Sequence, residues 1–286
     1  MSFQRILKPV LAATFVLAVL SPRLFAAEPG ETEKMLRRIT PPISVIKEME
    51  VEAKPKDQWY FDSFYEPSLI LQGNKTGRWG ELTNTFGYAH QNIQGYFSVS
   101  EYDRFGNNDY NANFGSYINM KNSYLRLESG FGWNVNYTYD FQAIGEYAHK
   151  LIKDVFWQVG YNYRMYRTSG DSHNVYPGLI YYFGGHYIAA NYGIGWIESR
   201  DDAHFGVIKG DFKITDFLRL SGGTAFGERL YDIFGRHAHS ETGYIVFSGL
   251  SLNLYKGITC RVGCSYGTEK PKFIKRSLNF GLNFKF

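Results

Sequence analysis

Alternation of apolar and polar residues is the strongest pattern in the chain, and it is clearest at the C-terminus. In the last eight residues the apolar side chains take one parity and the polar or small ones take the other: Phe280, Leu282, Phe284 and Phe286 against Asn279, Gly281, Asn283 and Lys285. Successive side chains of a β-strand point to opposite faces. The segment therefore predicts an amphipathic strand, typical of the closing strand of an outer-membrane barrel. An edge strand of a soluble sandwich is the alternative.

The same alternation recurs from residue 58 onward, interrupted by turn residues. It predicts an all-β fold, a transmembrane antiparallel up-and-down barrel of about 14 strands, with 12 as the alternative. The expected strands cover residues 59–71, 79–90, 93–104, 110–120, 123–133, 138–149, 155–166, 174–183, 186–197, 204–214, 217–228, 243–254, 258–268 and 274–286.

The connections between these strands fall into two length classes. In a barrel with an even number of strands both termini lie at the periplasmic end, so alternate connections must be short. The expected periplasmic turns are 91–92, 121–122, 151–154, 184–185, 215–216 and 255–257. The expected surface loops are longer almost throughout: 72–78, 105–109, 134–137, 167–173, 198–203, 229–242 and 269–273. A soluble meander has no reason to separate its loops in this way.

Charged residues share the parity opposite to the apolar face. A Lys or Arg that faces lipid at the bilayer midplane costs ~2–4 kcal/mol, so these charges are expected to point into the lumen. The candidate pore-lining residues are Asp62, Glu66, Arg126, Glu128, Glu146, Arg164, Lys209, Asp211, Arg219, Arg229 and Arg261. They predict a polar pore tuned for solute charge, or alternatively a self-paired network that rigidifies the wall. Inward aromatic residues such as Tyr60, Tyr166 and Phe247 either stack on sugar rings or simply fill the interior.

The N-terminal segment has a different composition from the rest. Arg5 and Lys8 precede an apolar run, and small residues follow it, which is typical of a secretory signal peptide over residues 1–27 with cleavage near Ala26 or Ala27. Residues 28–57 are polar and proline-containing, which predicts a periplasmic linker. The barrel then covers 58–286, and the predicted location is the bacterial outer membrane.

Charge and hydropathy exclude two other classes of protein. The net charge of +4 includes three basic residues of the signal segment, and without them 28 basic residues stand against 27 acidic ones. A nucleic-acid partner is therefore not predicted. Beyond the signal segment no run approaches the ~18 apolar residues of a helical membrane span. Aromatic residues make up 18% of the chain and the mean hydropathy is −0.32, which fits a wall where only alternate residues meet lipid.

Two resemblances follow from particular motifs. The spacing of Asn279, Gly281, Phe284 and Phe286 resembles the C-terminal signal read by the bacterial barrel-assembly machinery, which would then be a partner. The segments 174–188, 221–228 and 276–286 resemble the YaiO family of outer-membrane β-barrel proteins. That family is similar to barrels that pass exopolysaccharide, so the resemblance implies polysaccharide as a further partner. Outer-membrane lipid and lipopolysaccharide are the partners expected from the location.

The sequence carries no pattern that predicts an enzyme or a cofactor. Enzymes with an outer-membrane barrel fold usually carry a His-x-Ser motif, in which the histidine is the base and the serine is the nucleophile. None of the seven histidines is followed by serine two residues later. His237 and His239 have the spacing that places two imidazoles on one side of a strand, where zinc or nickel binds. Polar residues in an exposed loop are the favoured interpretation of that pair, so no metal is predicted.

These observations lead to two hypotheses about function. The first is a non-enzymatic barrel that forms a narrow or occluded pore, with surface polysaccharide or small solutes as the cargo. The second is a structural or adhesion barrel on the cell surface, with an occluded lumen and a working loop at 229–242.

Overall fold

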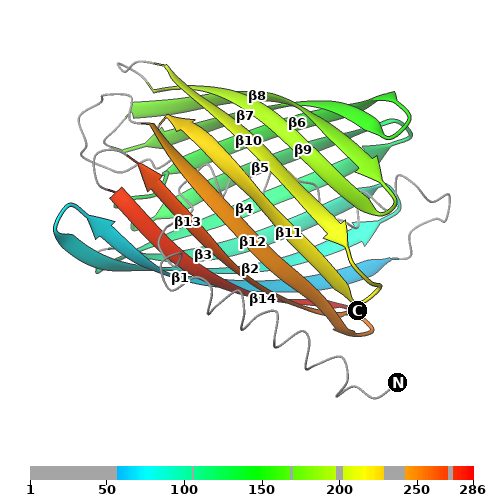
Figure 1. Cartoon of the computed structure of the whole chain (residues 1–286), viewed down its shortest axis with the longest axis horizontal. Coiled ribbons are helices and arrows are strands. Elements are labelled where there is room, and N and C mark those ends of the chain that lie inside the picture. The colour runs from blue at the N-terminus through cyan, green and yellow to red at the C-terminus, as the bar shows by residue number, and fades with distance from the viewer. Residues whose placement is uncertain (1–56, 105, 168–169, 198–201, 229–241, 270–272) are drawn as a thin grey trace.

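The computed structural model describes residues 57–286 except 105, 168–169, 198–201, 229–241 and 270–272. The predicted signal peptide and all but the last residue of the predicted linker lie outside the described residues. Fourteen antiparallel strands form one closed barrel, in which each strand pairs with its sequence neighbours and β1 pairs with β14 (Figure 1). The predicted fold class and strand number are confirmed. Among the described residues, no helix is long and apolar enough to cross a membrane.

The strands are long enough to cross a bilayer at the tilt usual for barrels. Their bounds are β1 Gln58–Gln72, β2 Lys75–His90, β3 Ile93–Arg104, β4 Asn107–Met120, β5 Ser123–Trp133, β6 Phe141–Ile152, β7 Val155–Tyr166, β8 Gly170–Phe183, β9 His186–Ile197, β10 Ala203–Lys213, β11 Leu218–Glu228, β12 Thr242–Tyr255, β13 Ile258–Glu269 and β14 Phe273–Lys285.

Four strands (β3, β5, β7 and β9) begin and end where the alternation predicts, and the main errors lie on the loop side. β2 begins at Lys75 rather than 79, and β4 and β8 also begin three or four residues early. The expected loop 72–78 is therefore wrong, because Gly73 adopts a φ of 61° and permits a two-residue hairpin. β6 is displaced toward 152, since a register shift between Lys150 and Ile152 adds a residue to this strand.

The two ends of the barrel differ in their connections. Gln58 and Phe286 lie at the end with the short turns, which we call the inner end; the opposite end is the outer end. Trp59 and Phe286 exchange two backbone hydrogen bonds of 2.9 and 3.0 Å there, which closes the seam between β1 and β14. The longest connection, 229–241, belongs to the outer end. The predicted segregation of loop lengths holds only in part. The outer connections 134–140, 198–202 and 229–241 are longer than every inner turn, but 73–74 and 105–106 have two residues each, so the expected loop 105–109 is wrong too.

The two faces of the wall differ in the way the alternation predicts. On β5, Leu127 and Phe131 are 50% and 52% exposed, whereas Arg126 and Glu128 between them are buried. Large apolar side chains are exposed on the outward parity around the barrel. No layer formed by the described residues covers this face, and hydrocarbon is the solvent that suits it.

Glycines on the inward face let side chains cross a neighbouring strand. The ring of Tyr60 on β1 lies over Gly87 on β2, and the ring of Tyr96 on β3 lies over Gly115 on β4. A β-carbon at either glycine would overlap the ring. Tyr96 thereby reaches β5, where its hydroxyl donates a hydrogen bond to Glu128. Side chains two strands apart are linked in this way across the inner surface.

Candidate functional site

The lumen is the candidate functional site, because the sequence-predicted charges gather there. Ten of the eleven predicted residues lie on the inward parity of their strands, and Arg229 lies outside the described residues. The ten are Asp62, Glu66, Arg126, Glu128, Glu146, Arg164, Lys209, Asp211, Arg219 and Arg261.

A buried network on β3, β5, β6 and β7 centres on Glu128. Its carboxylate accepts hydrogen bonds from Arg126 Nη2 at 2.8 Å and from Gln142 Nε2 at 2.9 Å, besides that from the Tyr96 hydroxyl. Arg164 Nε donates to Gln142 Oε1 at 2.8 Å. The Arg126 side chain is only 1% exposed. The network therefore joins two predicted cations and one carboxylate in a place where water does not reach them.

Tyrosines extend this network along the same wall. The Tyr124 hydroxyl donates to Glu146 Oε1 at 2.6 Å, and the Tyr139 hydroxyl donates to Asn113 Oδ1 at 2.7 Å. The guanidinium of Arg126 lies 5.7 Å from the ring centroid of Tyr117, within the range of a cation–π contact. Sequence reasoning selected charged residues and missed these tyrosines and amides, although their inward parity could have identified them.

Two further ion pairs lie near the inner end, and one of them is open to water. Arg219 Nε donates to Asp211 Oδ1 at 2.6 Å. Arg261 forms an ion pair with Asp62, and these two side chains are 38% and 25% exposed. Arg261 crosses Gly281, where a β-carbon would lie 2.9 Å from its Nε. The inner mouth of the lumen is thus a polar vestibule that water enters.

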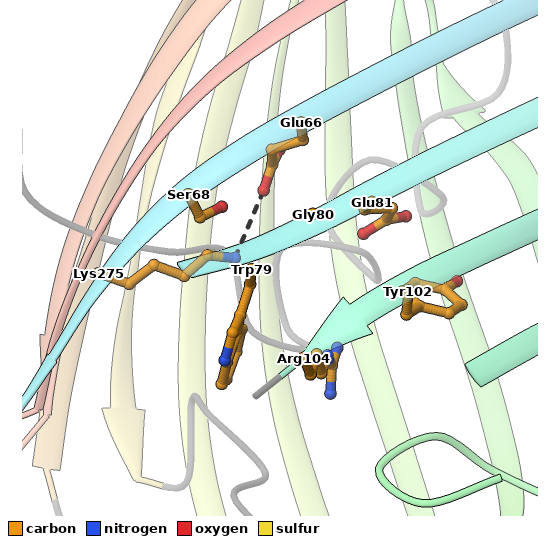
Figure 2. A pocket seen from close by; sticks show the side chains of 8 residues that line it. All are labelled: Glu66, Ser68, Trp79, Gly80, Glu81, Tyr102, Arg104 and Lys275. Atoms are coloured by element: carbon orange, nitrogen blue, oxygen red, sulfur yellow. Dashed lines mark hydrogen bonds and ion pairs between the residues drawn. The ribbon is translucent and has the colours of Figure 1, made fainter. Parts of the chain in front are cut away.

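A separate cluster lies toward the outer end, on β1, β2, β3 and β14. Lys275 Nζ lies 3.4 Å from Glu66 Oε1 and 5.4 Å from the ring centroid of Trp79, and the Arg104 guanidinium lies 4.9 Å from the same ring (Figure 2). The cavity between these side chains has a volume of about 10 Å³, close to the smallest space that holds one water. Lys275 and Arg104 were not predicted, although both occupy inward positions.

The outer half of the lumen is closed to water. Each strand carries at least one buried inward residue at or beyond its middle toward the outer end: Glu66, Trp79, Tyr102, Asn111, Glu128, Gln142, Asn162, Tyr176, Asn191, Phe205, Ala225, Ile245, Ser265 and Lys275. The wall of an open bore would expose such side chains. Seven strands also contribute to one apolar cluster that includes Phe205 and Ile245.

The three inward aromatic residues named from the sequence pack against the wall at different depths of the lumen. Phe247 packs against the apolar cluster, and Tyr166 is buried. Tyr60 accepts a hydrogen bond from Gln94 Nε2 at 2.9 Å while its ring covers Gly87. Tyr166 therefore has no room to stack on a sugar, whereas Tyr60 and Phe247 are only partly buried.

Several buried amides in the lumen lack hydrogen-bond partners. Both amide atoms of Gln158, Asn162 and Asn191 are buried and make no hydrogen bond in the described part of the chain. The closed lumen therefore carries amide donors and acceptors that no described side chain uses.

The remaining predicted residues lie apart from this network. Asn279 and Gly281 take the inward parity of β14, while Phe284 and Phe286 take the outward parity. His237 and His239 lie outside the described residues.

Comparisons with known proteins identify the fold. No family model matches the sequence, and no curated protein matches it. The outer membrane protein Omp33 of Acinetobacter baumannii is 11% identical, with a TM-score of 0.52 over 80% of this chain and 99% of that one. The CymD monoaromatic hydrocarbon channel is 6% identical, with a TM-score of 0.53 over 84% and 92% of the two chains. The chain therefore has the fold of outer-membrane β-barrels.

Proposed function

We propose that the protein is a non-enzymatic barrel of the bacterial outer membrane that forms a narrow, gated conduit for small polar solutes, closed in the state described above. The observation that carries the proposal is the polar composition of a lumen that excludes water in its outer half. A barrel interior that serves only as a core can be filled with apolar side chains, without charges whose burial is costly. Here charged and amide groups follow the wall from the vestibule toward the outer end.

The amides of the lumen support a path for polar solutes. The side chains of Gln158, Asn162 and Asn191 are buried in the lumen without a hydrogen-bond partner among the described residues, so their amides suit water or a polar solute. The ion pair between Arg261 and Asp62 is partly exposed at the inner mouth, so a path through the lumen would begin in an existing vestibule. Of the similar barrels, one is called a monoaromatic hydrocarbon channel, but the polar wall of this lumen favours polar solutes.

Planar-bilayer recording tests the conduit. We expect the wild-type barrel to be mostly closed, with brief openings of small conductance. Phe205→Ala removes a buried ring from the apolar cluster and is expected to raise the open probability several-fold. Phe131→Ala is the matched control, because this ring is exposed on the lipid-facing side of β5 and its loss leaves the lumen unchanged.

The alternative is a structural or adhesion barrel with a permanently occluded lumen, and the buried ring of residues from all fourteen strands favours it. The same recordings separate the two functions. A wild-type barrel that never conducts at any voltage, beside a Phe205→Ala variant that does, supports the structural barrel. If both are silent, the conduit is equally refuted.

Finer assignments rest on sequence motifs. The YaiO-like segments support membership of that family and a role in polysaccharide passage, but the filled lumen fits a polymer less well than a small solute. The missing His-x-Ser motif supports the absence of an enzymatic activity. The C-terminal motif supports assembly by the barrel-assembly machinery, in a membrane whose lipid and lipopolysaccharide would surround the barrel.

A further inference from the structure

Two outward-facing arginines differ from all the others in the described part of the chain. Six of its eight arginines make a hydrogen bond or an ion pair with another residue: Arg104, Arg126, Arg164, Arg167, Arg219 and Arg261. Arg78 on β2 and Arg276 on β14 make neither with any residue that the structure describes. A guanidinium presents five donors in a rigid fork and cannot lose its charge. Apart from the buried Nε of Arg276, these donors are therefore available to a ligand.

The strand pairing brings the two arginines to one site on the outside of the barrel. Leu69 on β1 pairs with Arg78 on one side and with Arg276 on the other. Neighbouring strands lie about 4.8 Å apart, so the two arginine backbones are separated by roughly 10 Å. Tyr266 on β13 pairs with Arg276 and continues the row on the outward face. The Nε of Arg276 is buried without a partner among the described residues, so this guanidinium lies against the wall.

The site lies at the outer edge of the apolar band. Trp59, Tyr88 and Phe286 form the corresponding row at the inner end, since Trp59 pairs with Tyr88 and bonds to the backbone of Phe286. Leu69, Arg78 and Arg276 lie ten residues farther along the same three strands. Ten tilted residues span the apolar band of a barrel, which is about 25 Å tall. The two guanidinium groups thus lie where lipid headgroups begin.

We propose that Arg78 and Arg276 bind phosphate on the headgroup of an outer-leaflet membrane lipid, across the seam between β1 and β14. A guanidinium can donate two parallel hydrogen bonds to one phosphate. Arg78 and Arg276 lie at a similar depth in the membrane, so both cations can reach the same anionic headgroup. Tyr266 adds a hydroxyl and a ring face beside Arg276. The carboxylates of Glu101 and Asp103 face outward on β3, on the far side of β2 from the seam. Because they repel anions, the anion site is confined to the seam between β1 and β14. This inference rests on the membrane location in the proposed function and not on the conduit.

Native mass spectrometry of the detergent-purified full chain tests the proposal. The probes are diphosphoryl lipid A, the same glycolipid after removal of both phosphates, phosphatidylglycerol, and inorganic phosphate. We expect the wild-type barrel to retain diphosphoryl lipid A at least tenfold more tightly than the dephosphorylated form. Arg78→Gln with Arg276→Gln is expected to remove that preference, and Arg78→Lys with Arg276→Lys to keep part of it. Arg167→Gln is the matched control, because this exposed cation at the outer end is already paired with Asp140.

Each result decides the proposal. Equal retention of the two glycolipids by the wild-type barrel overturns it, as does a double Gln variant with the wild-type preference. Retention of inorganic phosphate without any lipid preference indicates an adventitious ion only and also overturns it. If the double Gln variant does not fold, the wild-type glycolipid comparison and the double Lys variant still decide. Conductance plays no part in these readouts, so a failure here is separate from a failure of the conduit.

Discussion

The wall formed by β4–β7 and the wall formed by β11–β14 lie opposite each other in the closed strand order, yet they differ in the size of their inward side chains. The first wall carries Tyr124, Arg126, Glu128, Gln142, Glu146 and Arg164, all buried. The second carries many small residues, among them Ser221, Gly223, Gly249, Ser251 and Gly263. Large side chains of one wall therefore face small side chains of the other.

This difference explains how a wide barrel can be closed without a separate plug domain in its described part. An interior of about eight strands is just filled by ordinary side chains, and the diameter grows with the number of strands. Fourteen strands leave more space, so long side chains from one wall must reach inward, while small residues opposite make room for them. Water remains in contact with the small-residue wall at the inner end, where the inward residues of β11 and β12 are only half-buried.

The largest expected effect comes from breaking a buried ion pair of the large-residue wall. Arg126→Met removes the cation and leaves Glu128 buried, so we expect the free energy of unfolding to fall by about 3–5 kcal/mol. Urea unfolding of the refolded barrel in micelles, followed by tryptophan fluorescence, measures this loss. Arg261→Met is the matched change at the vestibule, where the ion pair with Asp62 is partly solvated and should contribute less than about 1 kcal/mol. Equal losses in the two variants would remove the distinction between the walls.

An intermediate effect is expected where a ring crosses a strand. A β-carbon at Gly160 on β7 would overlap the ring of Tyr176 on β8. Gly160→Ala should therefore lower the free energy of unfolding by about 1–3 kcal/mol through overpacking. The same substitution should cost less in a Tyr176→Ala background, where the ring is already absent. Gly145→Ala on β6 is the control, because its β-carbon would meet only Leu127 Cδ2 at 3.9 Å, an ordinary contact. A Gly160→Ala barrel as stable as the control would show that the crossing does not constrain the lumen.

The smallest effect on stability is expected from single Ser→Cys substitutions, which test how far water reaches along the small-residue wall. In a background with Cys260 and Cys264 replaced by serine, Ser251→Cys near the inner end should react quickly with a water-soluble thiol reagent. Ser265→Cys, on the neighbouring strand and buried toward the outer end, should react far more slowly. Equal rates would mean that water reaches the outer half of the lumen. Both variants should unfold as the background does, because serine and cysteine are similar in size.

The sequence by itself determined the strands and their faces. Alternation has a period of two, and a shift by one residue would move every apolar side chain into the lumen, so the pattern fixes the parity of each strand. It identified Arg126 and Lys209 as inward residues before any pairing was known. The same parity marks Lys275, Arg104 and Tyr96, none of which is among the candidates named from the sequence.

Only the tertiary structure decided which inward residues meet and whether the lumen is open. The bond between Tyr96 and Glu128 depends on two strand registers and on the missing side chain of Gly115 between them. The proximity of Arg78 and Arg276 likewise depends on the closing pair β1–β14, whose members are far apart in the sequence. Alternation is a local property of each strand, whereas pairing across strands and the filling of the interior are set by the registers and curvature of the whole closed sheet.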